Sequence, residues 1–239
     1  MSVTVWVALD TASRAAAEAW MDHLWPHRHF KVGLELFVRA GPEAVEAWAR
    51  GGAKIFLDLK LHDIPRTVAG AVAAARDLGV ELLTVHGAGG LAMLQAAAEH
   101  KGPMAVVAVT LLTSLGREEL AALGWGTESH PWVQRWANLA ARAGLDGVVS
   151  SGEELAQVRT LWPEGRRVVP GVRWTAGPAD DQRRVVTPAQ AARDGATDVV
   201  VGRLVTQDPN PRAALDRLLE TIGGEGPKGH GQEVRGWTG

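Results

Sequence analysis

The chain has 239 residues, of which 46% are hydrophobic and 22% charged, so it is long enough for one large domain with a substantial core. Its formal net charge of −2 gives no electrostatic reason to expect nucleic acid or an anionic membrane surface as a partner. The chain contains no cysteine, which excludes disulfides, thiolate nucleophiles and cysteine metal sites. The first residues, MSVTVWVALD, do not resemble a signal peptide, and no apolar run is long enough to cross a bilayer, so we expect a cytoplasmic protein.

Short apolar runs alternate with longer amphipathic segments along the chain. The runs expected to form strands are residues 3–9, 30–33, 54–59, 82–86, 104–112, 146–150, 167–172 and 198–202. The expected helices are residues 12–24, 36–50, 65–78, 90–99, 117–122 with 130–143, 152–161, 187–194 and 211–221. Strands that are each followed by a helix predict an α/β protein closed as a (β/α)8 TIM barrel. A doubly wound sheet is the structural alternative, but no Gly-rich dinucleotide fingerprint follows the first strand.

No linker-like break or strict internal repeat divides the chain, which indicates a single domain. We expect residues 1–222 to form one catalytic barrel domain. Residues 223–239, GGEGPKGHGQEVRGWTG, are Gly-rich and aperiodic, which predicts a flexible C-terminal tail.

Charged residues gather at the end of the third expected strand, in IFLDLKLHDIP (55–65). Asp58 and Lys60 are two residues apart, so on a strand both side chains point to one face, which in a barrel is the interior. Lys31 ends the preceding strand at the neighbouring interior position. Asp63 follows in the loop, where it could fold back to its own barrel mouth or reach a neighbouring subunit. Active sites of such barrels lie at this C-terminal end of the strands.

A structural network of ion pairs is the simplest explanation of this charged cluster. Burying ions is costly before pairing offsets the cost, however, and a plug of apolar side chains would close a barrel more cheaply. Only five of the 25 basic residues are lysine, yet lysine occupies both positions 31 and 60. Lysine can release a proton in practice, whereas arginine cannot. The choice of lysine indicates chemistry in which an ammonium donates a proton or stabilises a developing carbanion.

The last expected strand ends in VVVGR, with Gly202 and Arg203. Loops after the seventh and eighth strands of such barrels often bind phosphate. Glycine allows the backbone to approach closely, and arginine can hold two phosphate oxygens at once. The preceding loop, PGVRWTAGPADDQRRVVTP (170–188), is long and contains Gly and Pro, as expected of a closing lid. These features predict a phosphate site, against the plainer interpretation of Arg203 as a solvated surface residue.

The segment from Asp58 to Pro65 resembles the D-x-K-x-x-D-I-P signature of the orotidine 5′-phosphate decarboxylase family. The resemblance covers residues 3–221 and includes VALD, FKVG, LTVHGAGG, TLLTS, PGVR, DDQRRVVTP and VVGR. The D-x-K-x-x-D spacing alone is shared with sugar-phosphate relatives. These relatives use Mg²⁺ and resemble one another in having a carboxylate at the position where this chain has Lys31. An ammonium there would repel a divalent cation, so we expect no metal and no cofactor.

The resemblance implies a carboxy-lyase that decarboxylates orotidine 5′-monophosphate to UMP in de novo pyrimidine biosynthesis. The implied catalytic residues are Lys31, Asp58, Lys60 and Asp63, with Lys60 protonating C6 of the pyrimidine and Asp58 beside the departing carboxylate. The implied substrate-binding residues are Asp10, Lys31, Ile64, Thr67, Thr113, Arg173, Gln182, Gly202 and Arg203. The resemblance also implies a homodimer in which Asp63, Ile64 and Thr67 complete the partner's site.

Two functions of other classes stay open on the residues alone. A metal phosphohydrolase could use His62, Asp63 and His86, although a hydrogen-bonded core histidine explains His86 more simply. A catalytically silent nucleotide-binding barrel would keep Gln182 and Arg203 but would have no need of Lys60.

Overall fold

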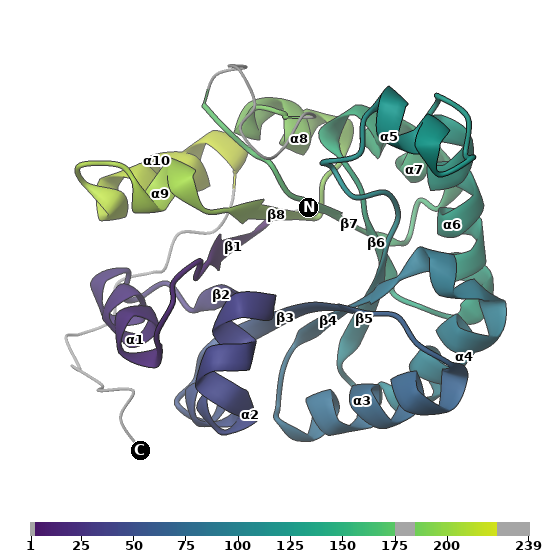
Figure 1. Ribbon diagram of the computed structural model, residues 1–239. Coiled ribbons are helices and arrows are strands. Elements are labelled where there is room, and N and C mark those ends of the chain that lie inside the picture. The colour runs from purple at the N-terminus through teal and green to yellow at the C-terminus, as the bar shows by residue number, and fades with distance from the viewer. Residues whose placement is uncertain (1–2, 175–184, 224–239) are drawn as a thin grey trace.

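Eight parallel strands form a closed barrel, with β1 to β8 neighbouring one another in chain order and helices around the outside (Figure 1). The structure is a computed structural model that describes residues 3–174 and 185–223. The closure of the sheet between β8 and β1 confirms the predicted (β/α)8 barrel and rules out the doubly wound alternative, whose sheet is open. Gln182 and the tail beyond residue 223 lie outside the described residues.

The strands lie close to their predicted positions. They are β1 (Thr4–Ala8), β2 (His29–Gly33), β3 (Lys54–Leu61), β4 (Leu82–His86), β5 (Ala105–Val109), β6 (Gly147–Val149), β7 (Arg166–Val169) and β8 (Asp198–Val201). Two predicted ends were three residues too late. β7 stops at Val169 because Pro170 has no N–H to continue the ladder, and the apolar run after β5 continues as loop residues, of which Leu111 is buried in the core.

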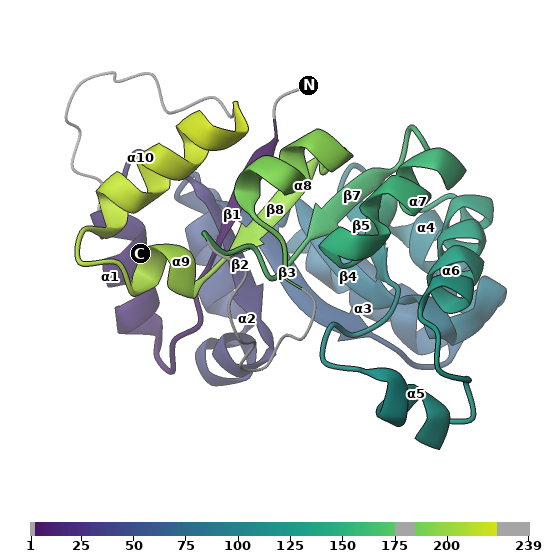
Figure 2. The same ribbon diagram turned by 90° about the horizontal axis from the view of Figure 1, so that it is seen from above.

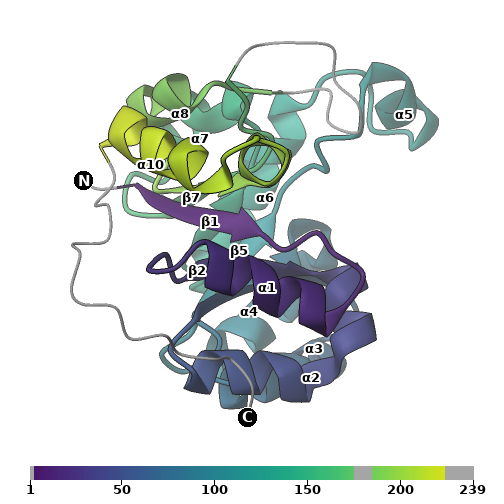
Figure 3. The same ribbon diagram turned by 90° about the vertical axis from the view of Figure 1, so that its left-hand side faces the viewer.

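The helices cover the outer face of the barrel. They are α1 (Arg14–His23), α2 (Leu34–Arg50), α3 (Pro65–Asp77), α4 (Gly90–His100), α5 (Arg117–Ala122), α6 (His130–Ala143), α7 (Leu155–Leu161), α8 (Pro188–Asp194), α9 (Arg203–Thr206) and α10 (Pro211–Ile222). Helix α5 stands off from the ring of helices (Figures 2 and 3). Helix α9 was not predicted, because four residues are too few to show a helical period. No helix within 3–174 or 185–223 is long and apolar enough to cross a membrane.

Strand side chains alternate between two apolar regions. The inner region fills the barrel and consists of Trp6, Ala8, Phe56, Leu82, Val107, Val168 and Val200. Residues that alternate with these, such as Val5, Leu57 and Leu83, belong to the larger region beneath the helices. This period of two is the strand geometry expected of a barrel whose centre is a packed core and not a pore.

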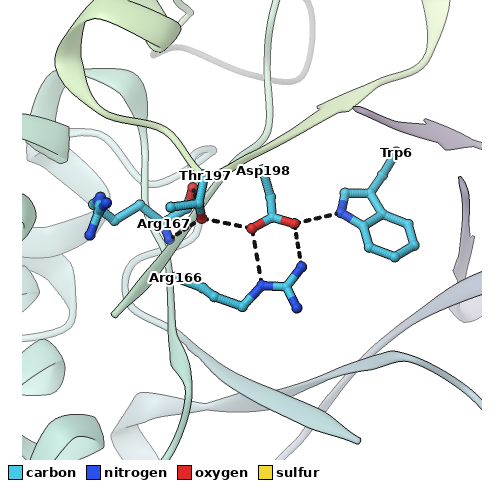
Figure 4. A network of polar contacts seen from close by, with 5 residues as sticks. All are labelled: Trp6, Arg166, Arg167, Thr197 and Asp198. Carbon is cyan, nitrogen blue, oxygen red and sulfur yellow. Dashed lines mark hydrogen bonds and ion pairs between the residues drawn. The ribbon is translucent and has the colours of Figure 1, made fainter. Parts of the chain in front are cut away.

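A network of polar contacts joins β1, β7 and β8 at the end of the barrel where the strands begin (Figure 4). The carboxylate of Asp198, only 1% exposed, accepts hydrogen bonds from Trp6 Nε1 at 2.8 Å and from Arg166 Nε and Nη2 at 3.1 and 2.5 Å. Thr197 Oγ1 donates to the same carboxylate at 2.7 Å and accepts from the backbone N–H of Arg167. The buried charge is therefore fully paired, as a charge in such a position must be.

Candidate active site

A cavity of about 270 Å³ opens at the end of the barrel where the strands finish. Its floor is apolar, since Ala8, Phe56, Val168 and Val200 of the inner region line it. Its walls carry the predicted site residues Asp10, Lys31, Asp58, Lys60, Thr113, Arg173, Gly202 and Arg203. The charged cluster and the predicted phosphate end thus face one cavity, which has the form of a small-molecule site: an apolar body with a few convergent polar groups.

Four charged side chains of alternating sign form a row along one wall. Lys31 Nζ lies 3.6 Å from Asp10 Oδ1 and 3.7 Å from Asp58 Oδ2. Lys60 Nζ donates a hydrogen bond to Asp58 Oδ1 at 2.8 Å. The side chains of Lys31 and Asp58 are only 12% and 16% exposed, so water screens their interaction weakly.

Two glycines make room for this row. A Cβ on Gly33, the last residue of β2, would lie 3.1 Å from Lys31 Nζ. A Cβ on Gly202, just after β8, would lie 3.2 Å from Asp10 Oδ2. Both distances are shorter than ordinary van der Waals contact, so a side chain at either position would press on a charged group of the row.

Lys60 has an unusual backbone, because it is the only non-glycine residue of the described chain with positive φ, at 50°. The pairing of β3 with β4 also changes register here, with Leu57 opposite Leu83 but Leu61 opposite Val85. β3 therefore contains a bulge between Leu57 and Leu61. The prediction that Asp58 and Lys60 lie together is confirmed, but its premise of a regular strand was wrong, since the bulge intervenes.

Thr84, on β4, is a residue of this site that the sequence reasoning missed. Its buried Oγ1 accepts a hydrogen bond from the backbone N–H of Lys60 at 2.8 Å and donates one to Asp58 Oδ1 at 2.9 Å. The available signal was a single hydroxyl in the apolar strand LLTVH, at an inward-facing position two residues after Leu82.

The pKa of Asp58 reports the balance of forces in the row. Burial would raise the pKa of this carboxyl, but the ammonium groups of Lys31 and Lys60, together with hydrogen bonds from Lys60 and Thr84, lower it below its usual value. Asp58 is therefore a carboxylate at neutral pH, and it carries a fixed negative charge between two cations.

The other predicted residues of the cavity wall follow three strands. Thr113 follows β5, Arg173 follows β7, and Gly202 and Arg203 follow β8. The backbone N–H of Arg173 donates to the carbonyl of Val186 at 3.0 Å, and Val172 forms an isolated parallel bridge with the same residue. The loop after β7 is thus held against the chain that precedes α8.

Three predicted site residues do not line the cavity. Asp63, Ile64 and Thr67 are exposed around the start of α3, and the side chain of Ile64 is 66% exposed. Asp63 Oδ1 accepts the backbone N–H of Ile64 at 2.6 Å. In the single chain, Asp63 therefore does not turn back into its own cavity.

The histidines proposed for a metal site have other contacts. The rings of His62 and His86 stack at 5.2 Å, and His86 Nδ1 accepts the backbone N–H of Ala88 at 3.2 Å. Burial lowers the pKa of His86, and the charges of His62 and Lys60 act in the same direction. Across residues 3–174 and 185–223, no three His, Asp or Glu side chains are grouped as a metal site.

Comparisons with known proteins agree with one another. A sequence model described as the orotidine 5′-phosphate decarboxylase / HUMPS family matches residues 4–218. An orotidine 5′-phosphate decarboxylase of Moorella thermoacetica is 49% identical over 228 residues, which cover 90% of each chain. One of Sphingopyxis alaskensis is 46% identical over 224 residues, covering 93% of this chain and 100% of its own. The crystal structure of orotidine 5′-phosphate decarboxylase from Lactobacillus acidophilus has a TM-score of 0.83 at 31% identity and covers 93% of this chain and 99% of that one.

Proposed function

The chain belongs to the orotidine 5′-phosphate decarboxylase / HUMPS family, and from that premise we propose how it converts orotidine 5′-monophosphate to UMP. Relatives that share 46–49% identity over at least nine-tenths of their length are named decarboxylases of this nucleotide. The chain is therefore a carboxy-lyase of de novo pyrimidine biosynthesis. A cytoplasmic location, expected from the sequence, is part of the proposal.

The observation that carries the mechanism is the row Asp10–Lys31–Asp58–Lys60 on the cavity wall. Loss of CO₂ breaks the bond between C6 and the carboxylate and leaves the electron pair on C6, in an orbital that the ring cannot delocalise. We assign to the Lys60 ammonium the stabilisation of this charge and then the transfer of a proton to C6. The lysine regains its proton from solvent, so the reaction releases CO₂ and UMP.

A single ammonium makes a substantial but incomplete contribution to this barrier. A unit charge pair at about 4 Å is worth roughly 4 kcal/mol at an effective dielectric constant near 20. The phosphate contacts supply binding energy far from the reacting carbon, which can hold the substrate carboxylate close to Asp58. We assign that role to Arg173, Gly202 and Arg203, with Thr113 contacting the pyrimidine and Asp10 and Lys31 the ribose. The proposed contact of Gln182 with base and phosphate lies outside the described residues.

The charge pattern also favours a reaction without metal. The Lys31 ammonium lies between the carboxylates of Asp10 and Asp58, within 4 Å of both. A divalent cation at these oxygens would have to approach that positive charge, and it would find few oxygen ligands. The sugar-phosphate chemistry of Mg²⁺-dependent relatives is therefore disfavoured here.

We further propose that the enzyme is a homodimer in which Asp63, Ile64 and Thr67 complete the partner's cavity. Large apolar side chains are exposed at the start of α2 and α3, and a second copy packed there would remove their surface from water: Leu34, Val38 and Ile64. A second copy that covered these side chains would bring the carboxylate of Asp63 to the open side of a cavity. It would extend the row of alternating charges by one member.

The direct test follows the absorbance of orotidine 5′-monophosphate in the presence of the purified protein, with and without EDTA. We expect UMP to form at the same rate in both samples. Release of inorganic phosphate that EDTA abolishes would support the metal phosphohydrolase. Tight binding of UMP without turnover would support the silent nucleotide-binding barrel.

A further inference from the structure

Thr84 is a polar residue in the apolar interior of the barrel. It lies on β4 two residues after Leu82 of the inner region, while its neighbours Leu83 and Val85 face outward beneath the helices. Its side chain is fully buried. A hydroxyl in such a place costs free energy unless it is hydrogen-bonded, so its partners indicate what it does.

Both partners of the Thr84 hydroxyl belong to the proposed catalytic pair. The backbone N–H of Lys60 can only donate, and the carboxylate of Asp58 can only accept. The hydroxyl has one proton, so it must accept from Lys60 and donate to Asp58. One side chain on β4 therefore joins the backbone of one catalytic residue to the side chain of the other.

The contact to Lys60 depends on the bulge in β3. In a regular β3 the Lys60 N–H would point toward β2, as the N–H of Lys54 does, because alternate residues of a strand face the same neighbour. At the bulge it donates instead to the Thr84 hydroxyl, and Lys60 adopts a φ of 50° that non-glycine residues usually avoid. The hydroxyl thus satisfies the backbone group that the bulge displaces.

The contact to Asp58 sets the rotation of its carboxylate. Oδ1 accepts from Lys60 Nζ at 2.8 Å and from Thr84 Oγ1 at 2.9 Å, while Oδ2 faces Lys31 Nζ at 3.7 Å. With two donors on Oδ1, the second oxygen is directed toward Lys31 and the cavity. We propose that Thr84 is a positioning residue for the decarboxylation, holding Asp58 and Lys60 in register through one hydroxyl; this rests on the proposed function.

The test compares Thr84→Val, which keeps the shape and removes the hydroxyl, with Thr84→Ser, which keeps the hydroxyl. We expect Thr84→Val to lower kcat by about tenfold to a hundredfold, as for a lost hydrogen bond to a charged group, and to change the Kd of UMP by less than about threefold. Thr84→Ser should restore kcat to within about threefold of the wild type. The phosphate end of the cavity does not contact Thr84, so binding and turnover should separate.

Thr110→Val is the matched control, because Thr110 is also buried and its Oγ1 donates to the carbonyl of Val149 at 2.9 Å, with no contact to the charged row. Its kcat should stay within about twofold of the wild type. Full kcat in Thr84→Val, or an equal loss in Thr110→Val, would overturn the proposal. Should Thr84→Val not fold, Thr84→Ala is assayed in the same way.

A second readout does not depend on activity. Crystal structures of Thr84→Val and of the wild type should differ in the contact between Asp58 Oδ1 and Lys60 Nζ, which we expect to lengthen beyond hydrogen-bond distance in the variant. A wild-type protein that does not decarboxylate the nucleotide would refute the proposed function, while these structures would still decide whether Thr84 positions the pair. An unchanged contact in the variant would refute the positioning role alone.

Discussion

Lys60 combines a strained backbone with a reactive side chain. The left-handed conformation of a non-glycine residue costs roughly 1–2 kcal/mol, and it persists only where surrounding contacts stabilise it. Here those contacts are the hydrogen bond from its N–H to Thr84 and the ion pair of its Nζ with Asp58. The strain lies at the residue to which we assign the proton transfer. There the strained backbone holds the ammonium in a fixed position.

Replacing Lys60 by alanine removes the ammonium to which we assign both the stabilisation of the charge on C6 and the proton transfer. We expect Lys60→Ala to lower kcat by about a thousandfold or more, while UMP still binds through the phosphate end. Turnover of orotidine 5′-monophosphate and calorimetric titration with UMP measure the two quantities separately.

Lys54→Ala is the matched control, since Lys54 begins the same strand, pairs with Glu81 and lies at the other end of the barrel. Its kcat should equal that of the wild type. Substantial turnover by Lys60→Ala would mean that another group delivers the proton.

Strands β1, β7 and β8 show how the two ends of the barrel differ at the scale of elements. Where these strands begin, Asp198 joins Trp6 and Arg166 in a network without access to the cavity. Where the strands finish, Gly202 and Arg203 line the cavity. Stability and chemistry thus lie at opposite ends of the same strands, as is general for this fold.

Removing the Asp198 carboxylate should destabilise the barrel without altering its chemistry. Asp198→Ala leaves the Arg166 guanidinium and the indole N–H of Trp6 without their partner, so we expect a loss of about 3–5 kcal/mol in the free energy of unfolding. Urea denaturation measures this loss, and kcat of the folded variant should be unchanged.

Glu46→Ala provides the comparison, because its ion pair with Arg50 is exposed on α2 and should contribute no more than about 0.5 kcal/mol. Equal losses in the two variants would show that the Asp198 network does not stabilise the closure of the barrel.

At the scale of the whole molecule, the proposed dimer accounts for side chains that the single chain leaves exposed. Asp63, Ile64 and Thr67 lie outside their own cavity, and Val38 on α2 is 79% exposed. Apolar exposure of this kind is covered in most oligomers by a symmetric copy of the same surface. A shared site would make activity depend on dimerisation.

Mixing two inactive variants tests this sharing. Asp63→Ala and Lys60→Ala each lack one component, but a mixed dimer would contain one site with both residues intact. At equal amounts and random pairing, the mixture should regain about one quarter of the wild-type activity. The activity of mixtures, with mixed dimers verified by mass spectrometry, is the measurement. Verified mixed dimers without activity would show that each site belongs to one chain.

The sequence by itself determined the fold and most of the cavity wall. Short continuous apolar runs with helical segments between them predicted eight strands within a few residues, because burial on both faces of a parallel barrel demands such runs. The strand-end positions of Lys31, Asp58 and Lys60 predicted that these side chains lie together, although the regular strand assumed for β3 contains a bulge. These features are local, so their pattern is visible along the chain.

Only the tertiary structure decided the contacts that hold this row and close the barrel. Thr84 meets Asp58 and Lys60 across 26 and 24 residues, and Trp6 meets Asp198 across 192. The bulge in β3 depends on its pairing with β4 and has no signature in the order of residues. Each of these features depends on hydrogen bonds between strands that folding brings together. The partner of a hydrogen bond is chosen by position in space and not by distance along the chain.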